Sequence, residues 1–327
     1  MTAATALPVI DLRSFDSLED LAADLMRVGK DPGFFYVVGH ELRDDVAADM
    51  FAVAETFFSS PLEEKVAYAN GSGDLGYTGM REETLSGAGP GDVKESFYLS
   101  DPGYTTQLLP AELESHRETM ADFFASCDSL AKTLLEGLAV GLGVSSSTTT
   151  TTTSSSPVDT PTSHAEDIRA GAHSDYGSLT LLFRQPSDQG GLQVLRGTDG
   201  AAAAAWADVP CLSDAVVVNI GDALEFWTAG RLRSTVHRVA FPRSASENVA
   251  RLSIPVFIQP DRHVVLAPIK AWRRDGGGLL QAADDQRDGE AEAEFLEVLR
   301  RKGYESAEPV TSREHLERRI RATYGKV

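Results

Sequence analysis

The chain has 327 residues, enough for one large or two small domains with a sizeable buried core. Its formal net charge of -19, from 49 acidic and 30 basic side chains, repels nucleic acid and anionic membranes. A site for an acidic ligand must therefore be built locally, around particular arginines or a metal ion.

Cysteine usage and hydropathy indicate the cell compartment. The two cysteines, Cys127 and Cys211, lie far apart, which excludes a disulfide framework or a cysteine zinc site and fits a reducing cytosol. Residues 1–8 lack the basic and apolar regions of a signal peptide, and no apolar stretch is long enough to span a bilayer. We expect a cytoplasmic protein without nucleic-acid or membrane partners, and nothing in the sequence demands more than a monomer.

The N-terminal region, residues 1–144, is predicted to mix strands and helices. Strands are predicted where aromatic and β-branched residues run together, at 9–12 and 33–39. Helices are predicted where apolar residues recur every three or four positions, at 17–28, 46–57, 61–67 and 110–142. Glycine is dense between 71 and 91, which favours a long surface loop.

The composition and hydrophobic pattern of the sequence then change twice. Residues 145–156 are an unbroken run of serine and threonine, for which a solvated loop is expected; we interpret 145–163 as a low-complexity linker or insertion. Beyond it, short strands separated by turns predict a β-sandwich or barrel core over 164–270. These strands are expected at 178–184, 192–195, 215–220, 234–241, 252–259 and 264–268, followed by C-terminal helices within 271–327, at 290–302 and 312–324.

Three side chains form a candidate metal site. His173 and Asp175 lie two residues apart before a predicted strand, so in extended backbone both side chains face one side. His237 lies in a β-branched strand that can bring a second imidazole across the sheet. Two histidines and one carboxylate are the set used by Fe(II) oxygenases, which leaves three coordination positions free. Taken alone, the H-x-D tripeptide is a weak signal, and His237 alone is typical of a buried core histidine.

A candidate carboxylate-binding pair follows. Arg251 and Ser253 also alternate onto one face of a predicted strand. A guanidinium group binds a carboxylate through two hydrogen bonds, and a hydroxyl can donate one more. The alternative is a surface salt bridge of little energetic weight.

These motifs, in this order, resemble the isopenicillin N synthase-like iron oxygenases. Within them, the chain is more similar to the members that use 2-oxoglutarate, including gibberellin and flavonoid oxidases and thymine hydroxylase. The resemblance covers nearly the whole chain and is carried by residues 169–183, 190–194, 219–222, 234–239 and 251–253, and in the N-terminal region by 8–12, 33–37, 76–77 and 94–97.

The resemblance implies a mainly β fold, a distorted double-stranded β-helix (jelly roll) flanked by N- and C-terminal helices. It implies that His173, Asp175 and His237 bind Fe(II) as the catalytic centre, and that Arg251 and Ser253 hold the distal carboxylate of 2-oxoglutarate. The reaction would consume O2, release succinate and CO2, and hydroxylate or desaturate a small organic molecule. Two alternatives stay open: an oxidase without 2-oxoglutarate, in which Arg251 binds a substrate carboxylate, and a catalytically impaired binding protein.

One departure from the family pattern concerns the wall of the site. Relatives carry a strand resembling L-R-L-L-H-Y-P before the H-x-D motif, where this chain has the serine and threonine run. Either another segment supplies this wall, or the pocket is open there and activity is impaired. Lys94, Glu95 and Phe97 are interpreted either as substrate contacts or as an ion pair and a core aromatic, and Tyr77 as part of a loop that closes over substrate.

Overall fold

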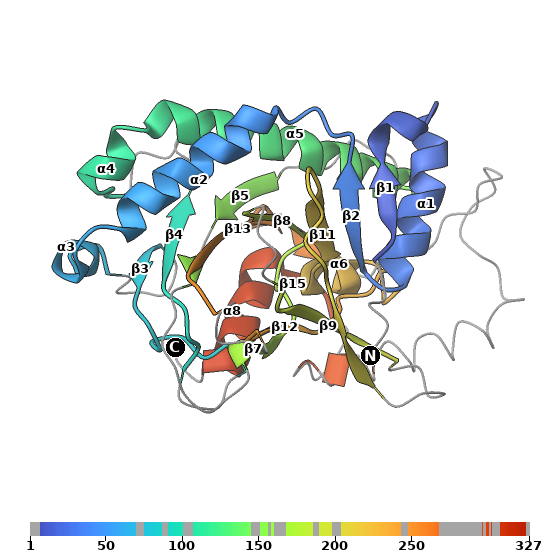
Figure 1. Cartoon of the computed structure of the whole chain (residues 1–327). Coiled ribbons are helices and arrows are strands. Elements are labelled where there is room, and N and C mark those ends of the chain that lie inside the picture. The colour runs from blue at the N-terminus through green and yellow to red at the C-terminus, as the bar shows by residue number, and fades with distance from the viewer. Residues whose placement is uncertain are drawn as a thin grey trace, which may run out of the picture.

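Two β-sheets at the centre of the molecule, flanked by helices, form the architecture of this computed structural model (Figure 1). The residues that the structure describes are 7–69, 75–86, 91–100, 107–144, 151–155, 158–159, 168–185, 190–197, 204–242, 248–267, 296, 299–300, 302 and 308–324. The central sheets and the helices that flank them confirm the predicted β core with helices from both ends of the chain.

The larger sheet has nine strands, and the smaller one has four. The larger sheet runs in the order β1 (Val9–Asp11), β2 (Phe34–Val38), β11 (Val216–Ile220), β8 (Leu179–Arg184), β13 (Arg251–Pro260), β5 (Thr151–Ser155), β4 (Ser96–Ser100) and β3 (Gly76–Thr78), with β6 (Val158–Asp159) paired to β13. The smaller sheet runs β10 (Ala205–Asp208), β9 (Leu192–Arg196), β12 (His237–Ala240) and β7 (Ile168–His173). A separate ribbon joins β14 (Val265–Leu266) to β15 (Val310–Thr311).

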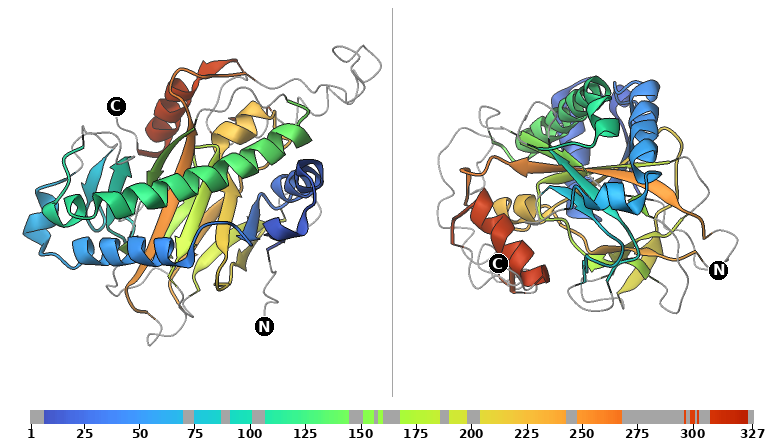
Figure 2. Two further views of the ribbon diagram at one scale, coloured as in Figure 1. Left: turned by 90° about the horizontal axis from the view of Figure 1, so that it is seen from above. Right: turned by 90° about the vertical axis from the view of Figure 1, so that its left-hand side faces the viewer.

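Helices cover one face of the larger sheet, which Figure 2 shows with α5 crossing the strands and α2 beside it. The covering helices are α1 (Leu18–Lys30), α2 (Asp44–Phe58) and α5 (Arg117–Gly141). The other helices are η1 (Leu12–Ser14), α3 (Leu62–Val66), α4 (Ala111–Glu114), α6 (Asp222–Trp227) and α8 (Ser312–Tyr324). The single helix predicted over 110–142 is divided at Ser115 and His116. The helix predicted over 290–302 lies largely outside the described residues.

Successive side chains along the central strands point to opposite faces of the larger sheet, and each face packs into a different hydrophobic cluster. Leu179, Leu181 and Phe183 of β8 point into the main core beneath the helices. The opposite face of the larger sheet packs on the smaller sheet, because a second cluster joins Phe34 of β2 and Val217 of β11 to β9. Polar side chains on that second face are therefore enclosed between the sheets.

The serine and threonine run contains a strand, so the expected solvated loop is wrong for residues 151–155. These residues form β5, which pairs with β13 from Val256↔Ser155 to Pro260↔Thr151 and with β4 at Leu99↔Ser155. The β-branched threonines favour extended backbone, and main-chain hydrogen bonds to two neighbouring strands hold the segment in the sheet. The glycine-rich segment 71–91, expected as a loop, likewise contains β3.

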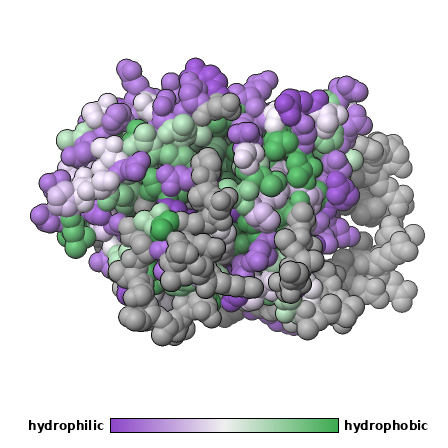
Figure 3. Space-filling model, in the orientation of Figure 1, coloured by the Kyte–Doolittle hydropathy of each residue, from purple (hydrophilic) through white to green (hydrophobic). Residues whose placement is uncertain are grey.

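Hydrophilic side chains line the upper and left edges of the face drawn in Figure 3, and apolar side chains gather nearer its middle. Among the described residues, no helix is both long and apolar enough to cross a membrane.

The C-terminal helix α8 is fixed to the core through His315. Its imidazole is 1% exposed, lies 3.1 Å by Nε2 from the carbonyl oxygen of Tyr176, and packs near the Phe226 ring. Burial lowers the pKa of His315 to about 4, against the opposing effect of the Asp222 carboxylate. The folded protein therefore keeps this imidazole neutral at pH values where the unfolded chain protonates it.

This difference predicts an acid-dependent loss of stability. The unfolded chain takes up a proton at His315 below about pH 6.5, whereas the folded chain does so only near pH 4, so unfolding is favoured as pH falls through this window. The substitution His315→Gln keeps a side-chain N–H for Tyr176 and removes the titration. Urea unfolding of the metal-free protein should lose about 2 kcal/mol less in the variant than in wild type between pH 7 and 4.5. Equal pH slopes would contradict this origin.

Candidate metal centre

Three ligand atoms converge where the smaller sheet meets the turn after β7. His173 ends β7, His237 begins β12, and the two residues are direct partners in the antiparallel ladder. Their ring centroids lie 4.3 Å apart, and Oδ1 of Asp175 lies 3.7 Å from Nε2 of His173 and 3.5 Å from Nε2 of His237. Among the described residues, these three form the one group of ligating side chains whose donor atoms all lie within 4.8 Å of one another.

Each imidazole is oriented by the main-chain carbonyl group two residues before it. Nδ1 of His173 lies 2.7 Å from the carbonyl oxygen of Gly171, and Nδ1 of His237 lies 3.2 Å from that of Thr235. A carbonyl only accepts, so each Nδ1 carries the proton and each Nε2 presents a lone pair to the common point. This is the arrangement of a histidine that binds a metal through Nε2.

The carboxylate is oriented from the larger sheet. Oδ2 of Asp175 accepts hydrogen bonds from the Thr180 hydroxyl at 2.6 Å and the Asn219 amide at 2.8 Å. Oδ1 accepts none from the described residues and faces the two imidazoles. Sequence reasoning did not assign these roles, although Asn219 is the one polar residue in the apolar strand 216–220 and Thr180 alternates inward on β8.

Electrostatics prepare the three groups for a cation. Burial lowers the pKa of His173 to about 4, aided by His237 and opposed by Asp175. Burial alone would raise the pKa of Asp175, but the two histidines and the hydrogen bonds from Thr180 and Asn219 lower it overall. At neutral pH the site thus offers a neutral imidazole at His173 and an ionised carboxylate, which a divalent cation requires.

An aromatic contact supports His237 from the larger sheet. The Phe34 ring meets its imidazole edge-on, with centroids 5.1 Å apart. The preceding residue, Gly33, has φ of +72°, and a Cβ there would lie 2.0 Å from the Arg233 carbonyl oxygen. Only glycine fits this close approach, which fixes where β2 begins and so where Phe34 lies.

Arg251 and Ser253 share a face of β13, as the alternation predicted, because Leu252 between them is buried on the other side. A guanidinium nitrogen of Arg251 donates to the carbonyl oxygen of Gly190, just before β9 of the smaller sheet. Ser253 pairs with Arg184, whereas Phe257 pairs with Thr180, so the backbone of Ser253 lies about 13 Å along the sheet from Thr180. The pair is thus on the sheet that orients Asp175 but is separated from the three ligands.

The residues suggested for the substrate pocket divide between two interiors. Phe97 is in the main core, and Glu95 pairs with the Lys65 ammonium at 2.9 Å and accepts the Tyr77 hydroxyl at 2.6 Å. Tyr77, itself 3% exposed, is therefore a core residue, and the expectation that it closes over substrate is wrong. The core-aromatic interpretation is therefore confirmed for Phe97. The expected ion pair is wrong in its partners, because Glu95 pairs with Lys65 and Lys94 pairs with Glu83.

Lys94 points the other way and belongs to a buried polar cluster. Its ammonium pairs with Glu83 and donates to the Ser96 hydroxyl at 3.1 Å, and the Tyr98 hydroxyl donates to Glu83 at 2.7 Å. The charge on Lys94 also contributes to lowering the pKa of His173. This cluster, which the sequence did not reveal beyond Lys94, therefore lies on the metal side of β4.

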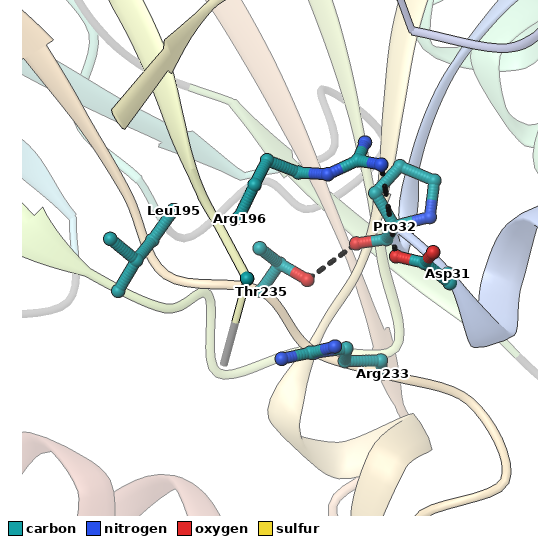
Figure 4. A pocket seen from close by; sticks show the side chains of 7 residues that line it. Asp31, Pro32, Leu195, Arg196, Arg233 and Thr235 are labelled. Carbon is teal, nitrogen blue, oxygen red and sulfur yellow. Dashed lines mark hydrogen bonds and ion pairs between the residues drawn. The ribbon is translucent and has the colours of Figure 1, made fainter. Parts of the chain in front are cut away.

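A cavity of about 350 Å³ flanks the site next to His237. Figure 4 shows the Thr235 hydroxyl turned to the Pro32 carbonyl, to which it donates, and Arg196 beside Asp31 at 4.0 Å. The cavity is lined by Asp31, Pro32, Leu195, Arg196, Gly197, Arg233 and Thr235. It lies beside the strand segment that orients His237 and does not include the three ligands.

Comparisons with known proteins agree with this geometry. Residues 7–121 match the family described as non-haem dioxygenase in morphine synthesis N-terminal, and residues 155–260 match the 2OG-Fe(II) oxygenase superfamily. A 2-oxoglutarate-dependent dioxygenase of Penicillium crustosum is 32% identical over 287 residues, covering 78% of this chain and 84% of that protein. Gibberellin 20 oxidase 3 of Oryza sativa subsp. japonica is 30% identical over 284 residues, covering 80% and 74%.

A solved structure shares the fold over almost the full length. The crystal structure of a full-length Neurospora crassa protein in complex with alpha-KG and thymine aligns with a TM-score of 0.72 and 24% identity, covering 97% of both chains. Sequence relatives of this length and identity, together with the two family matches, establish the ancestry of the chain. It belongs to the 2OG-Fe(II) oxygenase superfamily, whose cofactors are Fe(II), 2-oxoglutarate and O2.

Proposed function

We propose that this chain binds Fe(II) through Nε2 of His173, Oδ1 of Asp175 and Nε2 of His237, and that it hydroxylates or desaturates a small organic molecule. The observation that carries the proposal is the convergence of these three donor atoms within 4.8 Å. One carboxylate and two imidazoles suit Fe(II), and the set leaves coordination positions for a chelating co-substrate and O2.

The chemistry divides between the cofactors and the protein. When bound, iron supplies the activation of O2 that accompanies decarboxylation of 2-oxoglutarate to succinate and CO2. The protein holds its three ligands in fixed orientations and keeps His173 neutral, so that no proton competes for Nε2. The three side chains are largely removed from solvent, with 16% of His173, 6% of Asp175 and 10% of His237 exposed, which strengthens their interaction with a cation.

We assign Arg251 and Ser253 to the distal carboxylate of 2-oxoglutarate. Their side chains share the face of the larger sheet that carries Thr180, and the separation of about 13 Å along the sheet is shortened from both ends by side chains. In a chain of net charge -19, an arginine on the inner face is a strong local attraction for an anion.

Further aspects of the proposal concern the whole chain. We propose that the strands within 164–270 form a distorted jelly roll, and that the N-terminal region 1–144 and the tail 271–327 flank it. Strands β1 to β6, which precede residue 164, extend its larger sheet. We also propose a cytoplasmic monomer whose partner is its small-molecule substrate. The alternative of an impaired binding protein depended on a missing wall; because the backbone of β5 occupies the sheet between β4 and β13, nothing described favours that alternative.

The iron ligands are tested by the substitution His173→Ala. Anaerobic titration of the Fe(II) protein with 2-oxoglutarate should produce a saturable visible charge-transfer band in wild type, and the variant should lose it because one of three protein ligands is absent. His263→Ala, which removes an exposed histidine, is the matched control and should keep the band. Persistence of the band in His173→Ala would refute the ligand assignment, whereas iron binding without any band in wild type would favour the oxidase alternative.

The carboxylate assignment is tested by Arg251→Met. The loss of charged hydrogen bonds is worth about 1.5–3 kcal/mol, so the apparent KM for 2-oxoglutarate should rise at least about tenfold, measured from succinate formation. Arg43→Ala removes an exposed arginine and should leave this KM unchanged. If Arg251→Met alters kcat but not this KM, the guanidinium group does not bind the co-substrate.

The orientation of Asp175 is tested by Thr180→Val, which is close to isosteric. The carboxylate loses one of its two hydrogen bonds to Oδ2, so Fe(II) affinity should fall about tenfold or more. Equilibrium dialysis of the anaerobic protein measures this loss. Wild-type affinity in the variant would mean that Asn219 alone suffices.

A further inference from the structure

Buried charges lie directly behind the metal-binding turn. Asp222, the first residue of α6, has a side chain only 1% exposed. Its carboxylate accepts hydrogen bonds from the hydroxyls of Ser174 at 3.1 Å and Ser234 at 2.6 Å. Ser174 separates the first two metal ligands, and Ser234 lies three residues before the third. One carboxylate thus links the two chain segments that carry all three ligands.

Main-chain hydrogen bonds strengthen the same connection. The backbone N–H of Asp222 donates to the carbonyl oxygen of Asp175 at 2.7 Å, and that of Ala223 donates to Gly177 at 3.0 Å. Glu225, one turn further along α6, accepts from the backbone N–H of Ser234 at 2.9 Å. The start of α6 therefore contacts the metal-binding turn and the approach to β12 at several points.

Two basic residues from the C-terminal segment balance the two buried acids. The ammonium of Lys302 pairs with both Asp222 and Glu225. Nε of Arg319, on α8, lies 2.9 Å from Oδ2 of Asp222, as an ion pair and not an aligned hydrogen bond. The Arg319 guanidinium also lies over the Tyr176 ring, 5.2 Å from its centroid. Without these cations the acids would be buried and uncompensated, which is strongly unfavourable.

We propose that Lys302 and Arg319 are positioning residues of the metal centre: by pairing with Asp222 they hold its carboxylate between Ser174 and Ser234 and so fix the spacing of the ligands. Both lie beyond residue 260, where the second family match ends. Lys302 and Arg319, both from the C-terminal segment, thereby support the metal site. This inference rests on the proposed function, since it needs a metal to be bound there.

The experiment compares Arg319→Ala, Arg319→Lys and Arg313→Ala in the full chain. Arg313 lies on the same helix, 64% exposed and paired with Glu317, so it is the matched control. Co(II) is titrated into metal-free protein, and its visible spectrum gives both the affinity and the ligand geometry. Arg319→Ala should bind Co(II) about tenfold more weakly and with an altered spectrum, Arg319→Lys should recover part of the affinity, and Arg313→Ala should match wild type.

The outcomes separate this inference from the proposed function. Wild-type affinity and spectrum in Arg319→Ala would overturn the inference alone. Failure of the wild-type protein to bind either Co(II) or Fe(II) would overturn the proposed function and the inference with it. If circular dichroism shows Arg319→Ala to be unfolded, Ser234→Ala is measured instead; it removes one hydroxyl at Asp222 and must show the same weakened affinity and altered spectrum.

Discussion

The pairing of β12 with β7 is the constraint on which the site depends. It makes His173 and His237 direct neighbours across an antiparallel ladder, although 63 residues lie between them in the chain. Antiparallel partners have closely spaced side chains on one face, so two imidazoles reach one point without any special loop. Asp175 then needs only the turn that follows β7. The larger sheet orients the Asp175 carboxylate through hydrogen bonds that Thr180 and Asn219 donate to it.

Charge is distributed so that an acidic protein can still receive anions. The excess of negative charge belongs mainly to the surface, where ion pairs contribute little. Among the described residues, several buried or nearly buried acids outside the metal site form ion pairs: Glu95 with Lys65, Glu83 with Lys94, and Asp222 with Lys302 and Arg319. The buried Asp92 instead accepts hydrogen bonds from the backbone N–H groups of Leu85 and Gly171. The carboxylate of Asp175 has no such permanent cation among the described residues, and a metal ion would provide one.

The sequence predicted the elements whose signals are local. Alternation on 178–184 and 252–259 and the helical spacing in the N-terminal region correspond to observed strands and helices, and the three ligands follow from H-x-D and a β-branched strand. The roles of residues that depend on partners far away in the sequence were not predicted. Tyr77 lies in a glycine-rich stretch that reads as a loop, and only its buried contact with Glu95 reveals it as core. Similarly, the threonines of β5 favour a strand, but the uniformly polar run has no apolar alternation, so its place between β4 and β13 could not be predicted.

Both histidines are aligned in the same way, by a hydrogen bond from Nδ1 to the carbonyl oxygen two residues earlier in the chain, which lies within β7 for His173 and just before β12 for His237. The acceptor in each case is a main-chain oxygen, so this alignment does not depend on the identity of a partner side chain. The orientation of the two imidazoles thus depends on main-chain acceptors, whereas that of the Asp175 carboxylate depends on the side chains of Thr180 and Asn219. A fold built this way can exchange its pocket walls and acquire new substrates while its reactive centre stays constant.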